Sequence, residues 1–141
     1  MGFKLGSQEL ANECFRRQDE DPEFQEIFKG LTVKLLFVGT DCPGNEDRQL
    51  ALDIDNGRFI EILVTHKPAP SDLRTAPFDH TKYSFRVQAS QQTLIDMIHG
   101  KMDMIQALPH VKIDGDFGQL MSQATGFINF IKYLGSMDIE P

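Results

Sequence analysis

The chain has 141 residues and a formal net charge of −7, from 14 Lys and Arg against 21 Asp and Glu. A chain of this length folds as one domain that is large enough to bury a core with a cavity in it. It contains no apolar run near the ~20 residues that cross a bilayer. It also lacks the basic clusters of nucleic-acid-binding proteins. Because the acidic balance disfavours anionic membranes, any membrane contact is expected to be transient at most.

The N-terminal region carries two helix-start signals. Ser7 precedes one apolar helical face, and Asp21-Pro22 places an N-cap acid before a proline suited to the first helical turn. The apolar positions expected on these two helices are Leu10, Ala11, Cys14, Phe15, Phe24, Ile27 and Phe28.

Three β-rich segments follow, at residues 31–38, 49–55 and 58–65. The second alternates cleanly, and Asn56-Gly57 predicts a tight hairpin between the second and third. Residues 39–47 are polar and contain Pro43-Gly44, which predicts a turn region. The third segment is apolar on both faces and is therefore predicted to be a central strand.

Residues 66–81 contain three prolines and predict a long loop. With Asp72, Arg74 and Asp79, this loop is where a polar catalytic site could assemble, so an enzyme or enzyme subunit is the competing class. A surface loop rich in turn formers explains the same residues. The sequence shows no nucleophile–base pairing, no phosphate-binding glycine motif and no histidines at metal-ligand spacing. We therefore expect neither catalysis nor a metal ion nor a cofactor.

The last sixty or so residues give the most informative order of elements. Residues 82–89 alternate as a strand, Ser90 caps a helix that ends at Gly100, and a second short helical turn lies within 101–108. A strand at 111–114 leads through Gly115-Asp116 into one long amphipathic helix from Phe117, with Asp116 as its cap.

This order resembles the sterol carrier protein type 2 family of lipid-binding domains. The resemblance is clearest from about residue 82 to residue 134. The residues that carry it are Phe85-Arg86-Val87-Gln88-Ala89-Ser90, Leu94, Ile98, Gly100, Val111-Lys112-Ile113-Asp114-Gly115-Asp116 and Leu120. It implies a single domain over residues 1–141 with an α+β fold. The sheet would be five-stranded and mostly antiparallel, covered on one face by helices, with an apolar tunnel or cavity between the two layers.

The C-terminal helices also carry more large apolar side chains than one sheet face needs, and monomers rarely expose large apolar patches. Several are methionines, which suit pockets that accept ligands of varied shape but equally fill gaps in a core. The candidate lining of the cavity is Phe59, Phe85, Leu94, Met97, Ile98, Met102, Ile105, Leu108, Leu120, Met121, Phe127 and Ile131.

The sequence thus predicts a stand-alone cytoplasmic binding or carrier protein for a lipid-like hydrophobic ligand. A fatty acid, an acyl chain, an isoprenoid and a sterol all stay open. The alternative is a non-catalytic dimerising or accessory domain of a lipid-related enzyme system with a filled core, and homodimer formation also stays open. Cys14 and Cys42 lie far apart in sequence and are expected to be free thiols, as in a reducing cytoplasm.

Overall fold

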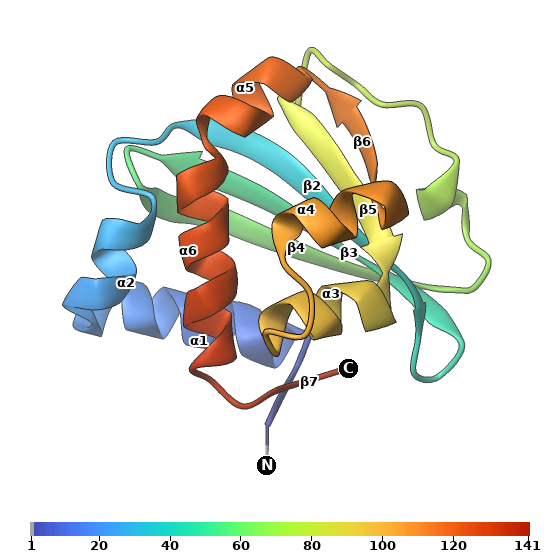
Figure 1. Cartoon of the computed structure of the whole chain (residues 1–141), viewed down its shortest axis with the longest axis horizontal. Coiled ribbons are helices and arrows are strands. Elements are labelled where there is room, and N and C mark those ends of the chain that lie inside the picture. The colour runs from blue at the N-terminus through green and yellow to red at the C-terminus, as the bar shows by residue number, and fades with distance from the viewer. Residues whose placement is uncertain (1) are drawn as a thin grey trace.

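The computed structural model describes residues 2–141 as one twisted sheet with helices packed over one of its faces (Figure 1). The strands of this sheet are β2 (Val33–Cys42), β3 (Glu46–Asp55), β4 (Arg58–Pro68), β5 (Phe85–Ser90) and β6 (Lys112–Gly115). The helices are α1 (Gln8–Glu20), α2 (Pro22–Ile27), α3 (Gln91–Ile98), α4 (Met104–Ala107), α5 (Phe117–Ser122) and α6 (Ala124–Gly135). Two 3₁₀ turns, η1 (Asp72–Arg74) and η2 (Leu108–His110), and two short terminal strands, β1 (Phe3–Lys4) and β7 (Ile139–Glu140), complete the fold. Within residues 2–141, no helix has both the length and the apolar character needed to cross a bilayer.

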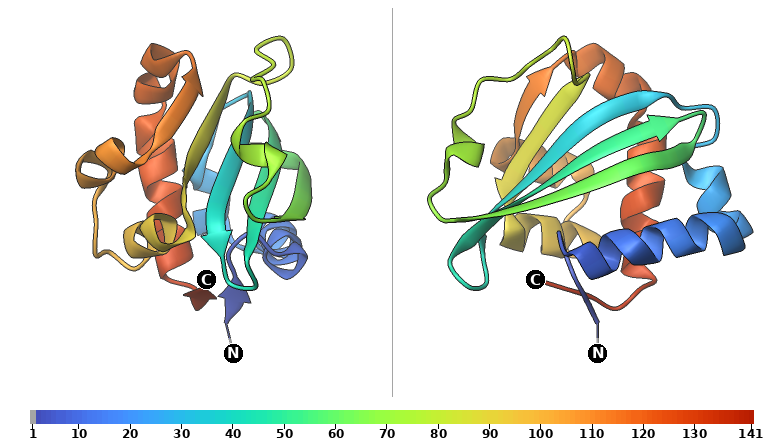
Figure 2. Two further views of the ribbon diagram at one scale, coloured as in Figure 1. Left: turned by 90° about the vertical axis from the view of Figure 1, so that its right-hand side faces the viewer. Right: turned by 180° about the vertical axis from the view of Figure 1, so that it is seen from behind.

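The five strands lie in the order β4-β3-β2-β5-β6. β3 pairs antiparallel with β2 and β4, β6 pairs antiparallel with β5, and β2 and β5 run parallel. Figure 2 shows α3 and α6 on one side of the sheet and the loop that precedes β5 on the other. The predicted α+β fold with a mostly antiparallel five-stranded sheet is therefore confirmed, and the β2–β5 pair is its one parallel step.

The local signals for helices and hairpins are confirmed at their residues. The side chains of Ser7, Ser90 and Asp116 accept hydrogen bonds from the backbone N–H groups three residues ahead, at the starts of α1, α3 and α5. Asn56 and Gly57 both have positive φ, 49° and 83°, as the two-residue hairpin turn between β3 and β4 requires.

The prediction that residues 58–65 form a central strand is wrong, because β4 lies at the edge of the sheet. The side chain of Ile60 falls in a bulge opposite Asp53 and Ile54 and is 59% exposed. Leu63 is 52% exposed on the face away from the helices. The apolar residues on both faces of β4 are therefore explained by the bulge and by partly exposed side chains. They do not indicate a strand with neighbours on both sides.

The outward backbone of this edge strand has a partner on α1. The side-chain amide of Gln18 accepts a hydrogen bond from the N–H of Phe59 and donates one of 3.1 Å to its carbonyl oxygen. Gln18 is buried in making this pair. The two bonds occupy both backbone groups of one residue of β4 and fix α1 against the strand.

Two further predictions are corrected by the structure. The polar turn expected at residues 39–47 is shorter, because the ladder between β2 and β3 continues to the pair Cys42–Glu46. The closing helix is also not continuous. It breaks at Gln123, whose φ of −106° and ψ of 10° are not helical, and this break separates α5 from α6.

The loop between β4 and β5 is fixed to the sheet by one buried carboxylate, that of Asp47. Asp47 is fully buried and accepts hydrogen bonds from the N–H and hydroxyl of Ser71, the N–H of Asp41 and the guanidinium of Arg74. The bonds from Arg74 hold the pKa of Asp47 well below its ordinary value, and those from Ser71 add to the effect. The polar residues of this loop thus stabilise the fold.

Asp47→Asn should lower the free energy of unfolding by about 3 kcal/mol at pH 7, because Arg74 loses its buried anionic partner. The wild-type contribution is present above the unfolded-state pKa near 3.9 and is lost as the pH falls through the lower folded-state pKa. Urea denaturation between pH 7 and pH 2.5 should therefore show the wild type losing its advantage over the variant below about pH 4.

Asp53→Asn, on the same strand, is the matched control, because the Asp53 carboxylate makes only a 3.8 Å surface ion pair with Lys34. It should change stability by less than about 1 kcal/mol. Equal losses for the two variants would contradict the special role given to Asp47.

Candidate functional site

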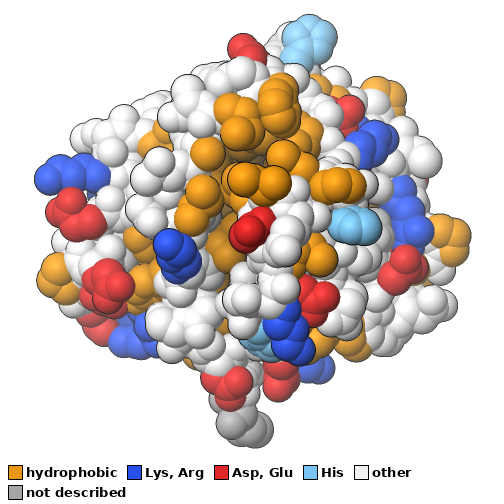
Figure 3. Space-filling view, in the orientation of Figure 1, with side chains coloured by type: hydrophobic (Ala, Val, Ile, Leu, Met, Phe, Trp, Pro, Cys, Tyr) orange, Lys and Arg blue, Asp and Glu red, His pale blue; other side chains and the backbone are white. Residues whose placement is uncertain are grey.

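A pocket of about 160 Å³ lies between the helix-facing side of the sheet and the helices. Figure 3 shows hydrophobic side chains gathered around a hollow on the face where α4, α5 and α6 meet. Met121, on α5, lines the pocket and is 44% exposed, so this side is the mouth. The opposite end is closed by Leu10, Ala11 and Cys14 of α1, all of which are buried.

Aromatic rings explain why the helix layer stands away from the sheet at this point. Phe28 contacts Phe59, Phe127 and Phe130 with ring centroids 5.3–5.8 Å apart, and Phe24 contacts Phe59 at 5.7 Å. These large rings fill the space between α2, α6 and β4.

Four small residues lie in the pocket wall among larger apolar side chains such as Phe37, Leu94 and Met97. These are Ala11, Gly39, Ala107 and Ala124. Small residues cannot fill a separation that is set by phenylalanine rings, so a pocket remains beside the aromatic cluster.

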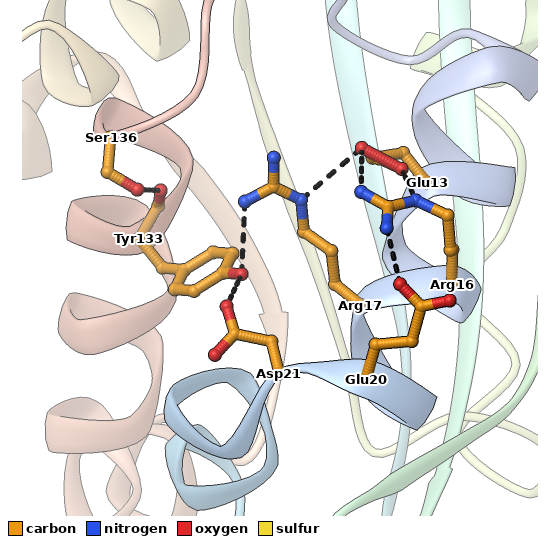
Figure 4. A network of polar contacts seen from close by, with 7 residues as sticks. All are labelled: Glu13, Arg16, Arg17, Glu20, Asp21, Tyr133 and Ser136. Carbon is orange, nitrogen blue, oxygen red and sulfur yellow. Dashed lines mark hydrogen bonds and ion pairs between the residues drawn. The ribbon is translucent and has the colours of Figure 1, made fainter.

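Polar contacts fix the C-terminal half of α6, which forms one wall of the pocket (Figure 4). The Tyr133 hydroxyl donates to the carboxylate of Asp21 and accepts a 3.1 Å hydrogen bond from Arg17. Asp21 also caps α2, and the Tyr133 bond contributes most to lowering its pKa. One carboxylate thereby joins α6 to the corner between α1 and α2.

The predicted lining residues divide into two groups. The structure places Phe59, Leu94, Met97, Ile98, Leu108, Leu120, Met121, Phe127 and Ile131 in the wall of the pocket. Their contact with a ligand stays a prediction.

Phe85, Met102 and Ile105 lie elsewhere. Phe85 is fully buried behind the wall, with its ring 5.7 Å from that of Phe127. Met102 lies in the bend between α3 and α4, and Ile105 is 79% exposed, because the single turn of α4 directs only part of its surface inward.

Most of the lining that was not predicted from the sequence comes from the N-terminal half of the chain. The lining outside the predicted set includes Leu5, Leu10, Ala11, Cys14, Phe37, Leu50, Leu52, Ile62, Val87, Met104 and Phe130. The alternation of Leu50 and Leu52 and the apolar face of α1 were visible in the sequence. These patterns predict which side chains point into the protein interior. They do not predict whether such a side chain packs against another side chain or lines a pocket.

The polar side chains at the closed end hydrogen-bond to the protein with some of their donor groups. Arg48 donates 2.7 Å to the carbonyl oxygen of Leu5 and 3.2 Å to the carboxylate of Glu46, while Gln91 donates 3.2 Å to the same Leu5 oxygen. These bonds hold the segment that follows β1 against β3 and α3. The pocket wall is therefore mainly hydrocarbon, with Ser7, Arg48 and Gln91 as polar members at the closed end.

Both cysteines are free and buried, and Cys14 is part of the pocket wall. Burial raises the pKa of the Cys14 thiol to about 12 and that of Cys42 to about 11, because a thiolate would lose its hydration. The site thus holds no reactive thiolate near neutral pH.

We expect both thiols to react with dithionitrobenzoate at pH 8 on the order of 100-fold more slowly in the native protein than in urea. Protein that is purified and denatured without reductant should show two reactive thiols. Recovery of fewer thiols, or rapid modification of Cys14 in the folded protein, would contradict its buried and reduced state.

Comparison with known proteins identifies the fold. A scan against protein-family models gives no match, and a search of curated proteins gives none. A crystal structure of sterol carrier protein 2 superposes with a TM-score of 0.71 at 15% identity, over 94% of this chain and 98% of that one. A conserved hypothetical protein of Thermus thermophilus gives 0.71 at 15%, over 99% and 94%. The sterol carrier protein domain 2 of Helicoverpa armigera gives 0.51 at 15%, over 94% and 90%. The resemblance seen in the sequence is confirmed for the fold, and the chain has the fold of the sterol carrier protein 2 domains.

Proposed function

We propose that this chain is a stand-alone, cytoplasmic binding or carrier protein for a lipid-like ligand held in the pocket. The observation that carries the proposal is the pocket wall, which Leu, Ile, Val, Met and Phe side chains form from both layers of the fold. Sites for small apolar molecules are concave, largely pre-formed and lined in this way. Each methylene moved from water into such a wall contributes about 0.8 kcal/mol.

Two observations favour this proposal over the competing classes. In the loop where a catalytic site could assemble, Arg74 and Ser71 are bound to Asp47, so their polar groups serve the fold. An accessory domain with a filled core fits less well, because the centre of this domain holds a pocket.

The surroundings of the mouth suit brief contact with a lipid surface. Ile105, Phe117 and Met121 are exposed there on α4 and α5. Residues 117–131 carry no charged side chain, although the chain has a net charge of −7. Transient contact with a membrane, during which a lipid enters or leaves, is therefore part of the proposal.

Ala124→Phe should abolish saturable binding of parinaric acid, a naturally fluorescent fatty acid, because the added ring occupies the pocket beside Phe127. Titration followed by fluorescence is the measurement. The chain has no tryptophan, so the protein's own emission interferes little.

Ala76→Phe is the matched control, since Ala76 is exposed in the loop on the other side of the sheet. It should bind parinaric acid as the wild type does. A wild type that shows no saturable binding of fatty acids, acyl-CoA or isoprenoids would reject the carrier function.

A further inference from the structure

We infer that the closed end of the pocket is a polar subsite, made by Ser7, Arg48 and Gln91, for an uncharged ligand group that both accepts and donates hydrogen bonds. The ligand class that matches it is a primary carboxamide on a compact apolar body about the size of one benzene ring. The inference shares the pocket with the proposed function, but it concerns a second class of ligand and does not depend on lipid binding.

The three side chains of this subsite are almost fully buried, and all three line the pocket. Ser7, Arg48 and Gln91 are 7%, 6% and 3% exposed. Two of them meet at one backbone atom, since the carbonyl oxygen of Leu5 accepts a 2.7 Å bond from Arg48 and a 3.2 Å bond from Gln91. Ser7 follows Leu5 by two residues and caps α1. The polar atoms of three segments, at the start of the chain, in β3 and in α3, therefore come together at one end of the space.

Arg48 retains donors that the protein does not use. A guanidinium group has five N–H groups. That of Arg48 directs one to the Glu46 carboxylate and two to backbone carbonyl oxygens, so two are left. Its charge, in contrast, is already matched, because a Glu46 carboxylate oxygen lies 3.2 Å from Nε. Arg48 is therefore able to donate to a ligand oxygen without requiring an anion there.

Gln91 supplies both a donor and an acceptor. Its side-chain amide uses one of two N–H groups, and no hydrogen bond from residues 2–141 reaches its amide oxygen. That oxygen lies beside Gly39, another lining residue, where a Cβ would be 2.6 Å from it. The Ser7 hydroxyl accepts the N–H of Leu10 and still has its own hydrogen to donate. The subsite thus offers one acceptor among several donors.

A carboxamide is the group that serves both kinds of atom. A ligand that displaces water from buried polar atoms loses affinity unless it replaces the hydrogen bonds. The carboxamide oxygen accepts from Arg48 or Ser7, and its NH₂ group donates to the oxygen of Gln91. A carboxylate has no hydrogen to donate, and it would bring a second negative charge to a cation that Glu46 already neutralises.

The size of the pocket limits the apolar part of the ligand. Its volume is about 160 Å³, close to the roughly 150 Å³ of an apolar cavity that binds benzene. The rest of the wall is mainly apolar, with side chains such as Phe37, Leu94 and Phe127. One benzene-sized ring therefore fits this space with α6 in its observed position, and its polar substituent then lies at the subsite.

The first test compares benzamide, acetophenone and benzoate as ligands of the wild type at pH 8, by NMR titration of isotope-labelled protein. The three molecules have nearly the same shape, and only benzamide both donates and accepts without a charge. Benzamide should bind at least about threefold more tightly than acetophenone, although acetophenone is the more apolar of the two, and at least about tenfold more tightly than benzoate. Acetophenone or benzoate binding as tightly as benzamide would overturn the inference, and so would the absence of benzamide binding at about 10 mM.

The second test removes the acceptor. Gln91→Met should weaken benzamide binding by about tenfold and acetophenone binding by less than about threefold, because the methionine keeps the length of the side chain without its amide. Gln92→Met is the matched control on the next residue of α3, where the side chain is exposed, and it should leave both affinities unchanged. Equal losses of the two ligands in Gln91→Met would contradict the assigned role of Gln91. The wild-type series needs no variant, so it decides the inference even if Gln91→Met does not fold.

The same titration locates the ligand. The side-chain amide resonances of Gln91 and the backbone resonance of Gly39 should shift on addition of benzamide, while the side-chain amide of Gln25, exposed on α2, should not. Shifts that leave Gln91 and Gly39 unaffected would place the ligand elsewhere and overturn the inference. Saturable binding of parinaric acid by a protein that fails these tests would leave the proposed function standing.

Discussion

The separation of the two layers by aromatic rings is the constraint from which the rest of the structure follows. Phe28 and its neighbours on α2, α6 and β4 fill one half of the interlayer space and hold α6 at the distance that phenylalanine rings impose. The small side chains of Ala11, Ala107 and Ala124 in the pocket wall do not span that distance. The pocket is therefore a product of unequal packing within one core, and three of the rings that set its width, those of Phe59, Phe127 and Phe130, lie in its wall.

The two ends of the chain pair with each other next to Leu5, which lines the closed end of the pocket. β1 pairs in parallel with β7, and the Leu5 carbonyl oxygen just after β1 accepts bonds from Arg48 and Gln91. His99, at the end of α3, makes a 2.8 Å contact with the carbonyl oxygen of Ile139 in β7. The closed end of the pocket thus depends on contacts between segments that are almost the whole chain apart.

The sequence predicted the features that local chemistry determines. Caps at Ser7, Ser90 and Asp116 and the turn at Asn56-Gly57 need only neighbouring residues, and each is confirmed. Strand order depends on long-range pairing, so the edge position of β4 could not be predicted from its apolar run.

Two features that shape the site could not be predicted from the sequence either, because they also depend on tertiary packing. The break at Gln123 has no proline or glycine at that residue to signal it. The wall contributed by α1 could not be inferred, because the inward face of a helix looks the same whether it meets a neighbour or a space.

The pairing of Gln18 with the outward backbone of Phe59 has a consequence for the behaviour of the protein in concentrated solution. An open edge strand with exposed apolar side chains, here Ile60 and Leu63, is a template on which a second molecule can add its own strand. An amide side chain that satisfies the N–H and the C=O of Phe59 removes that residue from the template and places α1 across the approach. We therefore expect Gln18 to disfavour the pairing of β4 with a strand of a second molecule. This effect on self-association is separate from ligand binding.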